Sequence, residues 1–335
     1  MSTTYFYPMK LNIQRPRRNR QSAAIRGMVQ ETFIHPSQLI MPFFLLEGDN
    51  RKVAIASMPG IFRYTIDEAI KEAKSCAAMG LVNFILFPVV EEKHKDKHAT
   101  YSYHPDCFYL KAILTFKKEL PDCTVITDVA MDPYSSDGHD GLYENGKIHN
   151  DQTLHILGKM SIAQAKAGAD VIGPSDMMDG RIGFIRNILD ENGYDQVAIM
   201  SYTAKYASCF YGPFRDALDS APKEGNKLSY QMSPGNQREA LIEAQLDEQE
   251  GADYLMVKPA LAYLDVISLL KNNTHLPIVA YNVSGEYAMI KAAAEKGWLD
   301  EKASMNEMLT SIKRAGADII ITYFAKQFVD TNFKG

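Results

Sequence analysis

The sequence predicts an α/β protein built as one (β/α)8 TIM barrel with an extended N-terminal arm. Short apolar runs recur eight times, helix-like segments lie between them, and glycine ends several of these helices just before the next run. Parallel strands that are covered on both faces have near-continuous apolar runs rather than alternating ones. Strands and helices that alternate over roughly 290 residues favour a barrel, and a doubly wound open sheet is the alternative fold.

The eight predicted strands are rich in Val, Ile, Leu, Phe and Tyr. They cover residues 39–45, 81–90, 124–132, 169–175, 196–203, 252–259, 277–284 and 317–324. No G-x-G-x-x-G motif follows the first strand, which argues against a dinucleotide-binding open sheet.

Three of the segments between strands have clear helical spacing of apolar residues and end in glycine. They are residues 66–80, 153–168 and 236–251. The tripeptide Gly-Ala-Asp precedes three of the strands, within AKAGAD, EQEGAD and KRAGAD. A helix that ends in glycine before a strand is the junction expected of a repeated βα unit.

The first 35 residues lie outside this pattern, so we predict an arm at 1–35 and a catalytic barrel at 36–335. The arm contains the basic and polar stretch QRPRRNRQSAAIRGM. Such a stretch can be a solvated tail, or it can be a segment that embraces another subunit.

The composition limits the class of protein. The chain has 335 residues, of which 46% are hydrophobic and 23% charged, and a formal net charge of −5. This is ordinary globular composition. No apolar run reaches the ~18 residues of a membrane span, and the N-terminus MSTTYFYPMKLN lacks a secretory signal pattern. We therefore expect a cytoplasmic protein with neither a membrane nor, given its net acidity, a nucleic acid as partner.

The cysteines give no sign of a metal centre. Four are present, Cys76, Cys107, Cys123 and Cys209, and no two of them form a C-x-x-C pair. The spacing fits neither a disulfide framework nor a zinc site, so we expect reduced thiols.

Polar groups stand at six successive strand ends, where the active site of a barrel enzyme lies. These residues are Asp128 and Asp132, Ser175, Lys205, Lys258, Ser284 and Tyr323. One such residue could be structural, but six of them predict a functional pocket.

Two lysines on neighbouring strands carry the clearest chemical signal. Lys258 ends the apolar run LMVKPA, and Lys205 follows the preceding strand. Neighbouring strands lie about 4.8 Å apart, so both amines can enter one pocket, where each lowers the pKa of the other. A neutral amine attacks a ketone to give a Schiff base. The alternative is a pair of surface lysines.

The loop DVAMDPYSSDGHDG (128–141) concentrates carboxylates that suit Mg²⁺ better than thiophilic metals. Its alternative interpretation is a turn-rich loop, because Asp, Ser, Gly and Pro favour turns. The segment at 210–231 lacks helix or strand periodicity and carries Arg215, Lys223 and Lys227. It is either a lid whose cations bind an anionic substrate or a solvated surface loop.

Long stretches of the chain resemble the porphobilinogen synthase (5-aminolevulinate dehydratase) family, in the family's order. They are RPRRNR, LIMPFFLLEG, TDVAMDPYSSDGHDG, IGPSDMMDGRI, SYTAKYASCFYGPFRDA, SYQM, YLMVKP, AYNVSGEY and IITYFA. The resemblance implies a barrel enzyme that condenses two molecules of 5-aminolevulinate to porphobilinogen, with loss of two waters, for tetrapyrrole synthesis.

The resemblance also implies roles for individual residues. Lys258 matches the lysine that forms a Schiff base with the first substrate, and Lys205 matches the second substrate-bonded lysine. One substrate carboxylate would be held by Arg215, Lys227 and Gln231, and the other by Ser284 and Tyr323. Two further residues, Asp128 and Ser175, would line the site.

The metals implied by the resemblance differ from those of zinc-dependent members. Those members carry three cysteines where this chain has Ala130, Asp132 and Asp140. Since thiolates retain Zn²⁺, an active-site zinc is not expected, and the aspartate-rich, magnesium-responsive type is implied, with Asp132 and Asp140 as candidate ligands of an active-site metal.

Magnesium and assembly complete the expectations from the resemblance. Glu243 matches a ligand of an allosteric Mg²⁺, and Asp179 would hold a water of that ion. The family also implies a homo-octamer in which the arm contacts a neighbouring barrel.

Two other functions are alternatives. A class I aldolase also uses a barrel lysine, but it does not require two adjacent lysines and two carboxylate clamps. An RNA-binding protein could use RPRRNR (15–20), but the run is short and no aromatic platform accompanies it.

Overall fold

The protein is described by a computed structural model at residues 14–220 and 222–333. The chain divides into two compact units, Met1–Phe33 and Ile34–Gly335. The described part of the first unit holds a 3-10 helix, η1 (Pro16–Arg20), and α1 (Ala23–Met28), and neither contains a buried residue. The oligomer contacts predicted for the arm at 1–35 stay a prediction, and its first thirteen residues lie outside the described ones.

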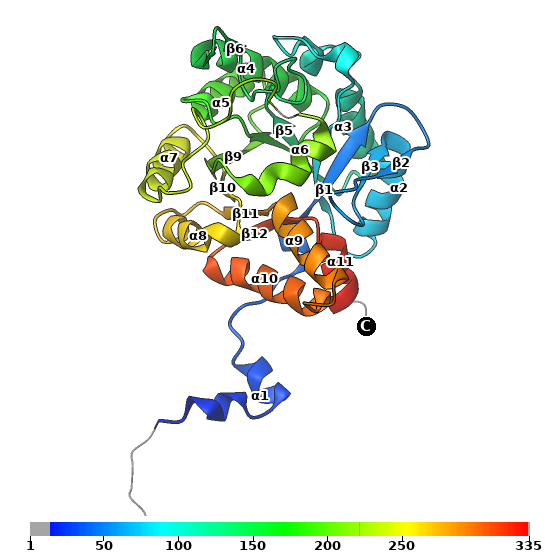
Figure 1. Ribbon diagram of the computed structural model, residues 1–335. Helices are drawn as coiled ribbons and strands as arrows, with labels where there is room; N and C mark the ends of the chain where they lie inside the picture. The colour runs from blue at the N-terminus through cyan, green and yellow to red at the C-terminus, as the bar shows by residue number, and fades with distance from the viewer. Residues whose placement is uncertain (1–13, 221, 334–335) are drawn as a thin grey trace, which may run out of the picture. The chain divides into compact units, whose positions relative to one another are not determined.

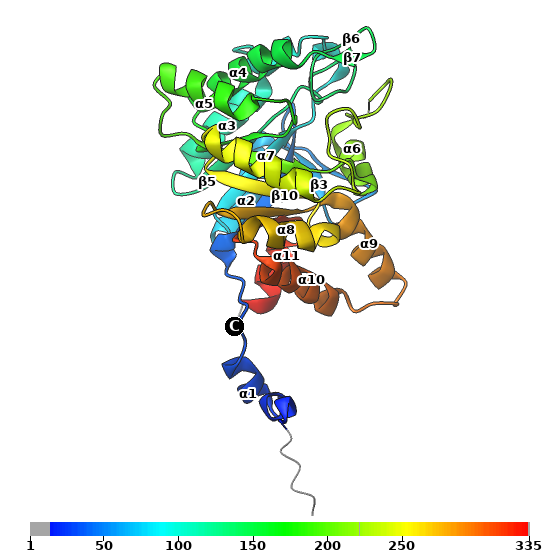
Figure 2. The ribbon, with the colours of Figure 1, turned by 90° about the vertical axis from the view of Figure 1, so that its left-hand side faces the viewer.

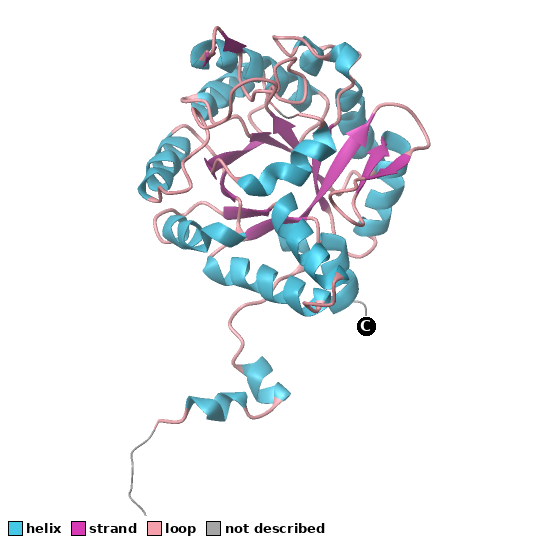
Figure 3. Cartoon of the chain, viewed as in Figure 1, coloured by secondary structure: helices cyan, strands magenta, loops and turns pink. Residues whose placement is uncertain are grey.

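Eight parallel strands of the second unit form a closed barrel (Figures 1 and 3). In order they are β1 (Leu39–Leu46), β4 (Asn83–Pro88), β5 (Thr124–Val129), β8 (Val171–Pro174), β9 (Ala198–Lys205), β10 (Tyr254–Lys258), β11 (Ile278–Asn282) and β12 (Ile319–Thr322). Leu39 of β1 pairs in parallel with Ile320 of β12, which closes the sheet. The predicted (β/α)8 barrel is confirmed, and the open sheet is wrong.

Helices surround the strands, as a barrel requires (Figure 1). They are α2 (Ile66–Ala77), α3 (Phe108–Glu119), α4 (Asn150–Lys166), α5 (Arg181–Glu191), α7 (Arg238–Gln249), α8 (Leu264–Lys271), α9 (Ser284–Glu295), α10 (Glu301–Ala315) and α11 (Ala325–Asn332). The three helices predicted from periodicity are α2, α4 and α7. Gly168 follows α4 with φ +101, a left-handed conformation that only glycine adopts easily.

Several smaller elements were not predicted. A strand β3 (Phe62–Thr65) extends the sheet beside β1, and β2 (Lys52–Ala54) pairs with it antiparallel. A hairpin of β6 (Tyr143–Glu144) and β7 (Lys147–Ile148) follows the aspartate-rich loop. Runs of two to four residues are too short to show a period. Short 3-10 helices complete the chain, η2 (Pro36–Gln38), η3 (Glu92–His94), η4 (Thr100–Tyr103), η5 (Cys209–Tyr211) and η6 (Leu261–Tyr263).

Two boundary predictions near the site were wrong. The segment 210–231 contains a helix, α6 (Gly212–Leu218), whose seven residues are too few for a periodic signal. The seventh strand was predicted to reach Ser284, but β11 ends at Asn282 and Ser284 begins α9. The backbone N–H of Val283 donates to Glu286 at 3.0 Å, so a helix start replaces the strand end there.

None of the described helices is long and apolar enough to cross a membrane.

Candidate active site

The strand ends meet beneath helix α6, which crosses in front of them in Figure 1 and lies at one end of the barrel in Figure 2. Lys205 and Lys258 end β9 and β10 and are paired residues of these strands. Both are buried, with 6% and 5% of their surface exposed. The predicted pair of neighbouring lysines is therefore present in the structure, and both Nζ atoms lie near the Tyr202 ring, at 5.9 Å for Lys205 and 5.1 Å for Lys258.

An irregularity in β9 sets the direction of the side chains at this strand end. Leu255 pairs with Ser201, but Val257 pairs with Ala204, so β9 has one residue more than β10 in this stretch. A bulge of this kind reverses the alternation of side chains along a strand. Lys205 consequently points the same way as Tyr202, and its Nζ lies 5.9 Å from the Tyr202 ring centroid.

Lys205 is tied to the aspartate-rich loop. Its Nζ donates to Asp140 Oδ2 at 3.0 Å and also to the Ser175 carbonyl oxygen. Lys227 Nζ contacts the other oxygen of Asp140 and lies 3.3 Å from Asp132 Oδ2. Burial alone would raise the pKa of Asp140, but the ammonium groups of Lys205 and Lys227 outweigh it and hold that pKa below its usual value.

Lys258 has a different environment. Nothing in residues 14–220 and 222–333 hydrogen bonds or ion pairs with its Nζ, and four aromatic rings lie around it. Burial, and next the ammonium of Lys205, lower the pKa of Lys258 to about 7. A large fraction of Lys258 is therefore a neutral amine near neutral pH.

Three buried polar atoms near the lysines have no hydrogen-bond partner within the described chain. They are Asp128 Oδ1, Tyr202 Oη and Gln231 Oε1. Buried polar atoms are normally paired, so these atoms indicate a place for a polar ligand. Burial, and next the charge of Asp132, raise the pKa of Asp128 to about 7. Asp128 can therefore both donate and accept a proton near neutral pH.

The predicted carboxylate-binding residues fall into two groups. Lys227 and Gln231 lie with Asp140, to which Gln231 Nε2 donates at 3.4 Å. Arg215 is half-buried on α6, and its guanidinium has no hydrogen bond or ion pair within the described ranges. This leaves a guanidinium that can bind an anion.

The second group consists of Ser284 and Tyr323, and Ser284 contacts α6 directly. Ser284 Oγ accepts the backbone N–H of Phe214 at 2.9 Å and donates to the Phe210 carbonyl oxygen at 3.3 Å. The hydroxyls of Tyr323 and Tyr281 are 2.9 Å apart. Both groups thus border the same short helix, as the lid interpretation of 210–231 requires.

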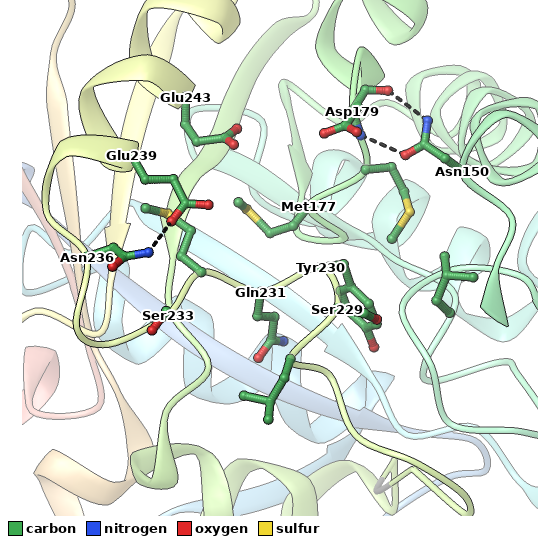
Figure 4. Close-up of a pocket in the computed structure, with 14 residues that line it drawn as sticks. Asn150, Met177, Asp179, Ser229, Tyr230, Gln231, Ser233, Asn236, Glu239 and Glu243 are labelled. Atoms are coloured by element: carbon green, nitrogen blue, oxygen red, sulfur yellow. Dashed lines mark hydrogen bonds between the residues drawn. The ribbon is translucent and has the colours of Figure 1, made fainter. Parts of the chain in front are cut away.

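A separate cavity of about 400 Å³ contains the residues expected to hold magnesium. Glu243 and Asp179 both line it, and their carboxylates point toward the same space (Figure 4). Glu239 lines it as well and accepts from Asn236 Nδ2 at 3.1 Å. Burial is the main reason that the pKa of Glu243 is raised to about 7. A bound cation would relieve this penalty.

Nowhere in the described part of the chain, the Glu243 cavity included, do three His, Cys, Asp or Glu side chains cluster to hold one metal ion. Asp132 and Asp140, the candidate ligands in the aspartate-rich loop, are instead paired with lysines. Ala130, beside them, is buried and offers no donor atom.

Sequence reasoning missed the aromatic surroundings of Lys258. Tyr202, Tyr211, Phe214 and Tyr281 all approach its Nζ. Near-continuous apolar strands do not reveal which residues face the barrel interior, and the bulge in β9 is not visible in the sequence. The only signal was the number of aromatic residues close to Lys205 and Arg215.

The fold and the lysine site together define a class of enzyme: barrel enzymes with a buried, partly neutral lysine that can add to a carbonyl compound. Comparison with known proteins gives the family. The family model described as Delta-aminolevulinic acid dehydratase matches residues 13–331. The chain belongs to this family, so it is an enzyme of the hydro-lyase class, and both the aldolase and the RNA-binding alternatives are wrong.

Individual relatives agree with this assignment. The chain is 54% identical over 318 residues to the chloroplastic delta-aminolevulinic acid dehydratase of Physcomitrium patens. The match covers 93% of this chain and 73% of that protein. It is 49% identical over 322 residues to the delta-aminolevulinic acid dehydratase of Chlamydia pneumoniae, and this match covers 96% of this chain and 97% of that protein. The crystal structure of the Toxoplasma gondii enzyme in complex with porphobilinogen superposes with a TM-score of 0.94 at 50% identity, over 96% of this chain and 92% of that one.

Proposed function

We propose that this chain condenses two molecules of 5-aminolevulinate to porphobilinogen, with loss of two waters, through Schiff bases on Lys258 and Lys205. Family membership supports the overall reaction. The observation that carries the roles of the lysines is their pairing at adjacent strand ends, where Lys258 is partly neutral and Lys205 is bound to Asp140.

The first chemical step uses Lys258. Its free amine adds to the ketone carbon of one substrate, and the amine loses a proton while the former ketone oxygen gains one. The hydroxyl then takes up a second proton and leaves as water, and the nitrogen lone pair forms a carbon–nitrogen double bond that carries one positive charge. Asp128, with its pKa of about 7 and its unpaired Oδ1, is the group we propose to move these protons.

The two carboxylate clamps position the substrates. One consists of Arg215, Lys227 and Gln231, and it faces the Lys205 side of the pocket, since Lys227 and Lys205 share Asp140. The other consists of Ser284 and Tyr323. A substrate carboxylate at the first clamp competes with Asp140 for Lys227, so binding would leave Lys205 as the main cationic partner of Asp140. Ser175 contributes the carbonyl oxygen that Lys205 contacts.

Incubation of the full chain with 5-aminolevulinate, followed by a colour reaction for the pyrrole, tests the overall reaction. Steady formation of porphobilinogen is expected. If the protein, purified in the presence of Mg²⁺, formed no pyrrole, the proposed function would be contradicted. This outcome does not depend on the roles assigned to single residues.

We further propose that the enzyme is of the magnesium-responsive type, with Glu243 as the one direct protein ligand and Asp179 binding through water. Mg²⁺ keeps most of its waters and commonly binds one or two carboxylates. The cavity fits such an ion, because Glu243, Glu239 and Asp179 line it and no ion pair neutralises them within the described residues. Bound there, the ion would supply positive charge next to residues 228–232, the end of the lid segment, which line the same cavity.

An active-site zinc does not fit the residues present. Ala130 has no ligand atom, and Asp132 and Asp140 serve as counterions of Lys227 and Lys205. No step above uses a metal in this pocket. A chelator selective for Zn²⁺ over Mg²⁺ should leave activity largely intact. Loss of activity on adding this chelator would contradict the proposal.

We also propose a homo-octamer in which residues 1–35 contact a neighbouring barrel. Neither η1 nor α1 has a buried residue. This supports a contact with another subunit, because a short helix without a buried face needs a partner to be stable. Deleting residues 1–35 should give smaller assemblies by light scattering and lower activity. An unchanged assembly would make the arm a tail. A cytoplasmic location stays a prediction from the sequence.

A further inference from the structure

Four aromatic rings surround the Nζ atom of Lys258, and we call them the Lys258 cage. The distances from Nζ to the ring centroids are 4.6 Å for Tyr281, 4.8 Å for Phe214, 5.1 Å for Tyr202 and 5.2 Å for Tyr211. All four lie within the ~6 Å at which a cation interacts with the face of an aromatic ring. The rings come from β9, β11 and the lid segment.

Two tyrosines of the cage are fixed by hydrogen bonds of their own. Tyr211 donates its hydroxyl to the carbonyl oxygen of Lys258 at 3.0 Å. The hydroxyl of Tyr281 lies 2.9 Å from that of Tyr323. A site that is ordered before the reaction needs no reorganisation when charge develops.

Phe214 is held as firmly, although it belongs to the lid helix α6. Its ring packs edge to face on Phe87, with centroids 5.1 Å apart and planes at 89°, and lies 5.7 Å from Phe44. Its backbone N–H donates to Ser284. Because Arg215 is the next residue, one short helix carries both a substrate-carboxylate ligand and a ring of the cage.

We propose that the Lys258 cage stabilises the iminium cation formed at Nζ in preference to the ammonium ion from which it is made. This inference rests on the proposed function, since it concerns the Schiff base on Lys258. Overall, the ammonium and the ketone give the iminium and one water, so the charge is conserved and only its chemical form changes. The cage discriminates between these two forms of one positive charge.

The preference follows from the number of N–H donors. An ammonium has three donors, and nothing in residues 14–220 or 222–333 accepts a hydrogen bond from Nζ. An iminium has one, and its charge is spread over carbon and nitrogen. Aromatic faces attract either cation without accepting a hydrogen bond, so the cation with fewer unsatisfied donors gains more. A carboxylate in the same place would favour the ammonium and reduce the free amine.

Fluorination of Phe214 tests the proposal, because fluorine weakens the negative face of the ring and nearly preserves its shape. Full-length chains would carry phenylalanine or its 4-fluoro, 3,5-difluoro or 3,4,5-trifluoro form at position 214. Levulinate is the probe, since it has the ketone and carboxylate of the substrate but lacks the amine needed for condensation. Borohydride reduction and intact mass then give the iminium fraction at each levulinate concentration.

The expected result is a graded fall of the iminium equilibrium constant with each added fluorine. The range for one cation–π contact corresponds to roughly two- to thirtyfold between phenylalanine and a ring without the attraction. If Phe214 served only to exclude water or to fill space, the fluorinated chains would trap levulinate as well as wild type, and the proposal would be wrong.

Matched controls separate this outcome from the others. The same fluorinated residues at Phe116 of α3, which is buried against Phe43 and Phe84, should leave trapping unchanged. A fall at both positions would indicate a general loss of stability and contradict the proposal. Absence of any label on Lys258 in the wild type would instead contradict the proposed function itself.

Discussion

Lys205 and Lys258 lie opposite each other in adjacent strands, but only Lys205 has a carboxylate partner among the described residues. Asp140 lies 3.0 Å from the ammonium of Lys205, whereas aromatic rings surround that of Lys258. Two equivalent positions in the sheet are thereby given different charge states. Burial, and next the charge of Lys205, depress the pKa of Lys258, the residue that we propose as the first nucleophile.

Replacing Lys205 by methionine should abolish pyrrole formation and alter Lys258. Removing the neighbouring ammonium takes away one cause of the low pKa of Lys258, although burial, the larger cause, remains. The pKa of Lys258 then rises above about 7, so less free amine is present at pH 7. The pH profile for trapping levulinate on Lys258 should move to higher pH. Lys223→Met, a lid lysine paired with Glu92 at the surface, should not move it, and a profile unchanged in Lys205→Met would contradict the coupling.

Arg215→Ala should weaken the binding of one of the two substrates. A charge-assisted contact of about 1.5–3 kcal/mol corresponds to a ten- to hundredfold loss of affinity. Arg215 has no competing partner within the described chain, so its loss should raise KM with little change in melting temperature. Arg215→Lys keeps the charge without the bidentate geometry, so its KM should lie between those of the wild type and Arg215→Ala. Equal KM values for all three proteins would show that Arg215 of the lid segment does not bind the substrate.

Lys227→Ala should differ from Arg215→Ala in one respect. Lys227 also neutralises the buried Asp132 and Asp140, so its removal leaves two carboxylates with less compensation. We expect both a higher KM and a lower melting temperature in thermal unfolding. A variant that lost affinity at wild-type stability would show that these ion pairs contribute little to the fold.

Arg63 should anchor the lid helix from outside the active site. Its Nε donates to the carbonyl oxygen of Ala217 at 2.7 Å and its Nη2 to that of Asp216 at 2.6 Å, at the C-terminal end of α6. Arg63→Ala should therefore speed proteolytic cleavage within 210–231 and raise KM severalfold, since a cation at the C-terminal end of a helix is stabilising. Lys52→Ala, on the neighbouring strand β2, is the control. Equal cleavage rates in the two variants would exclude the anchor.

Magnesium should stimulate the enzyme through Glu243. Wild type and Glu243→Ala would be titrated with Mg²⁺ while pyrrole formation is measured, and only the wild type should respond. Glu248→Ala is the matched control. Glu248 is on the same helix α7 but outside the cavity and accepts a hydrogen bond from Thr274, so this variant should be stimulated by Mg²⁺ like the wild type. Equal stimulation of the Glu243 variant would exclude this residue as the ligand.

The sequence predicted the parts of the molecule that repeat. The βα units were found because eight apolar runs and glycine-terminated helices obey simple periods, and Lys205 and Lys258 were found because charged residues interrupt buried strands. The helix α6 and the β2–β3 hairpin were missed because seven residues or fewer do not establish a period. They are formed by tertiary contacts such as those of Arg63 with Ala217.

The interior of the site could not be predicted for a different reason. A single-residue bulge decides whether Tyr202 and Lys205 face the same side, and local sequence does not specify it. Likewise, Asp140 was expected to be a candidate metal ligand, and its distance to Lys205 follows only from the packing of the aspartate-rich loop beside β9. The residue types were informative, whereas their pairing required the structure.

The central claim is that Lys258 forms the first Schiff base. The full chain would be mixed with 5-aminolevulinate, reduced with borohydride within the first turnover, digested and analysed by mass spectrometry. We predict an added substrate mass on the peptide that contains Lys258, and neither label nor pyrrole formation in a folded Lys258→Ala variant. A label confined to another lysine, or an active Lys258→Ala variant, would contradict the account.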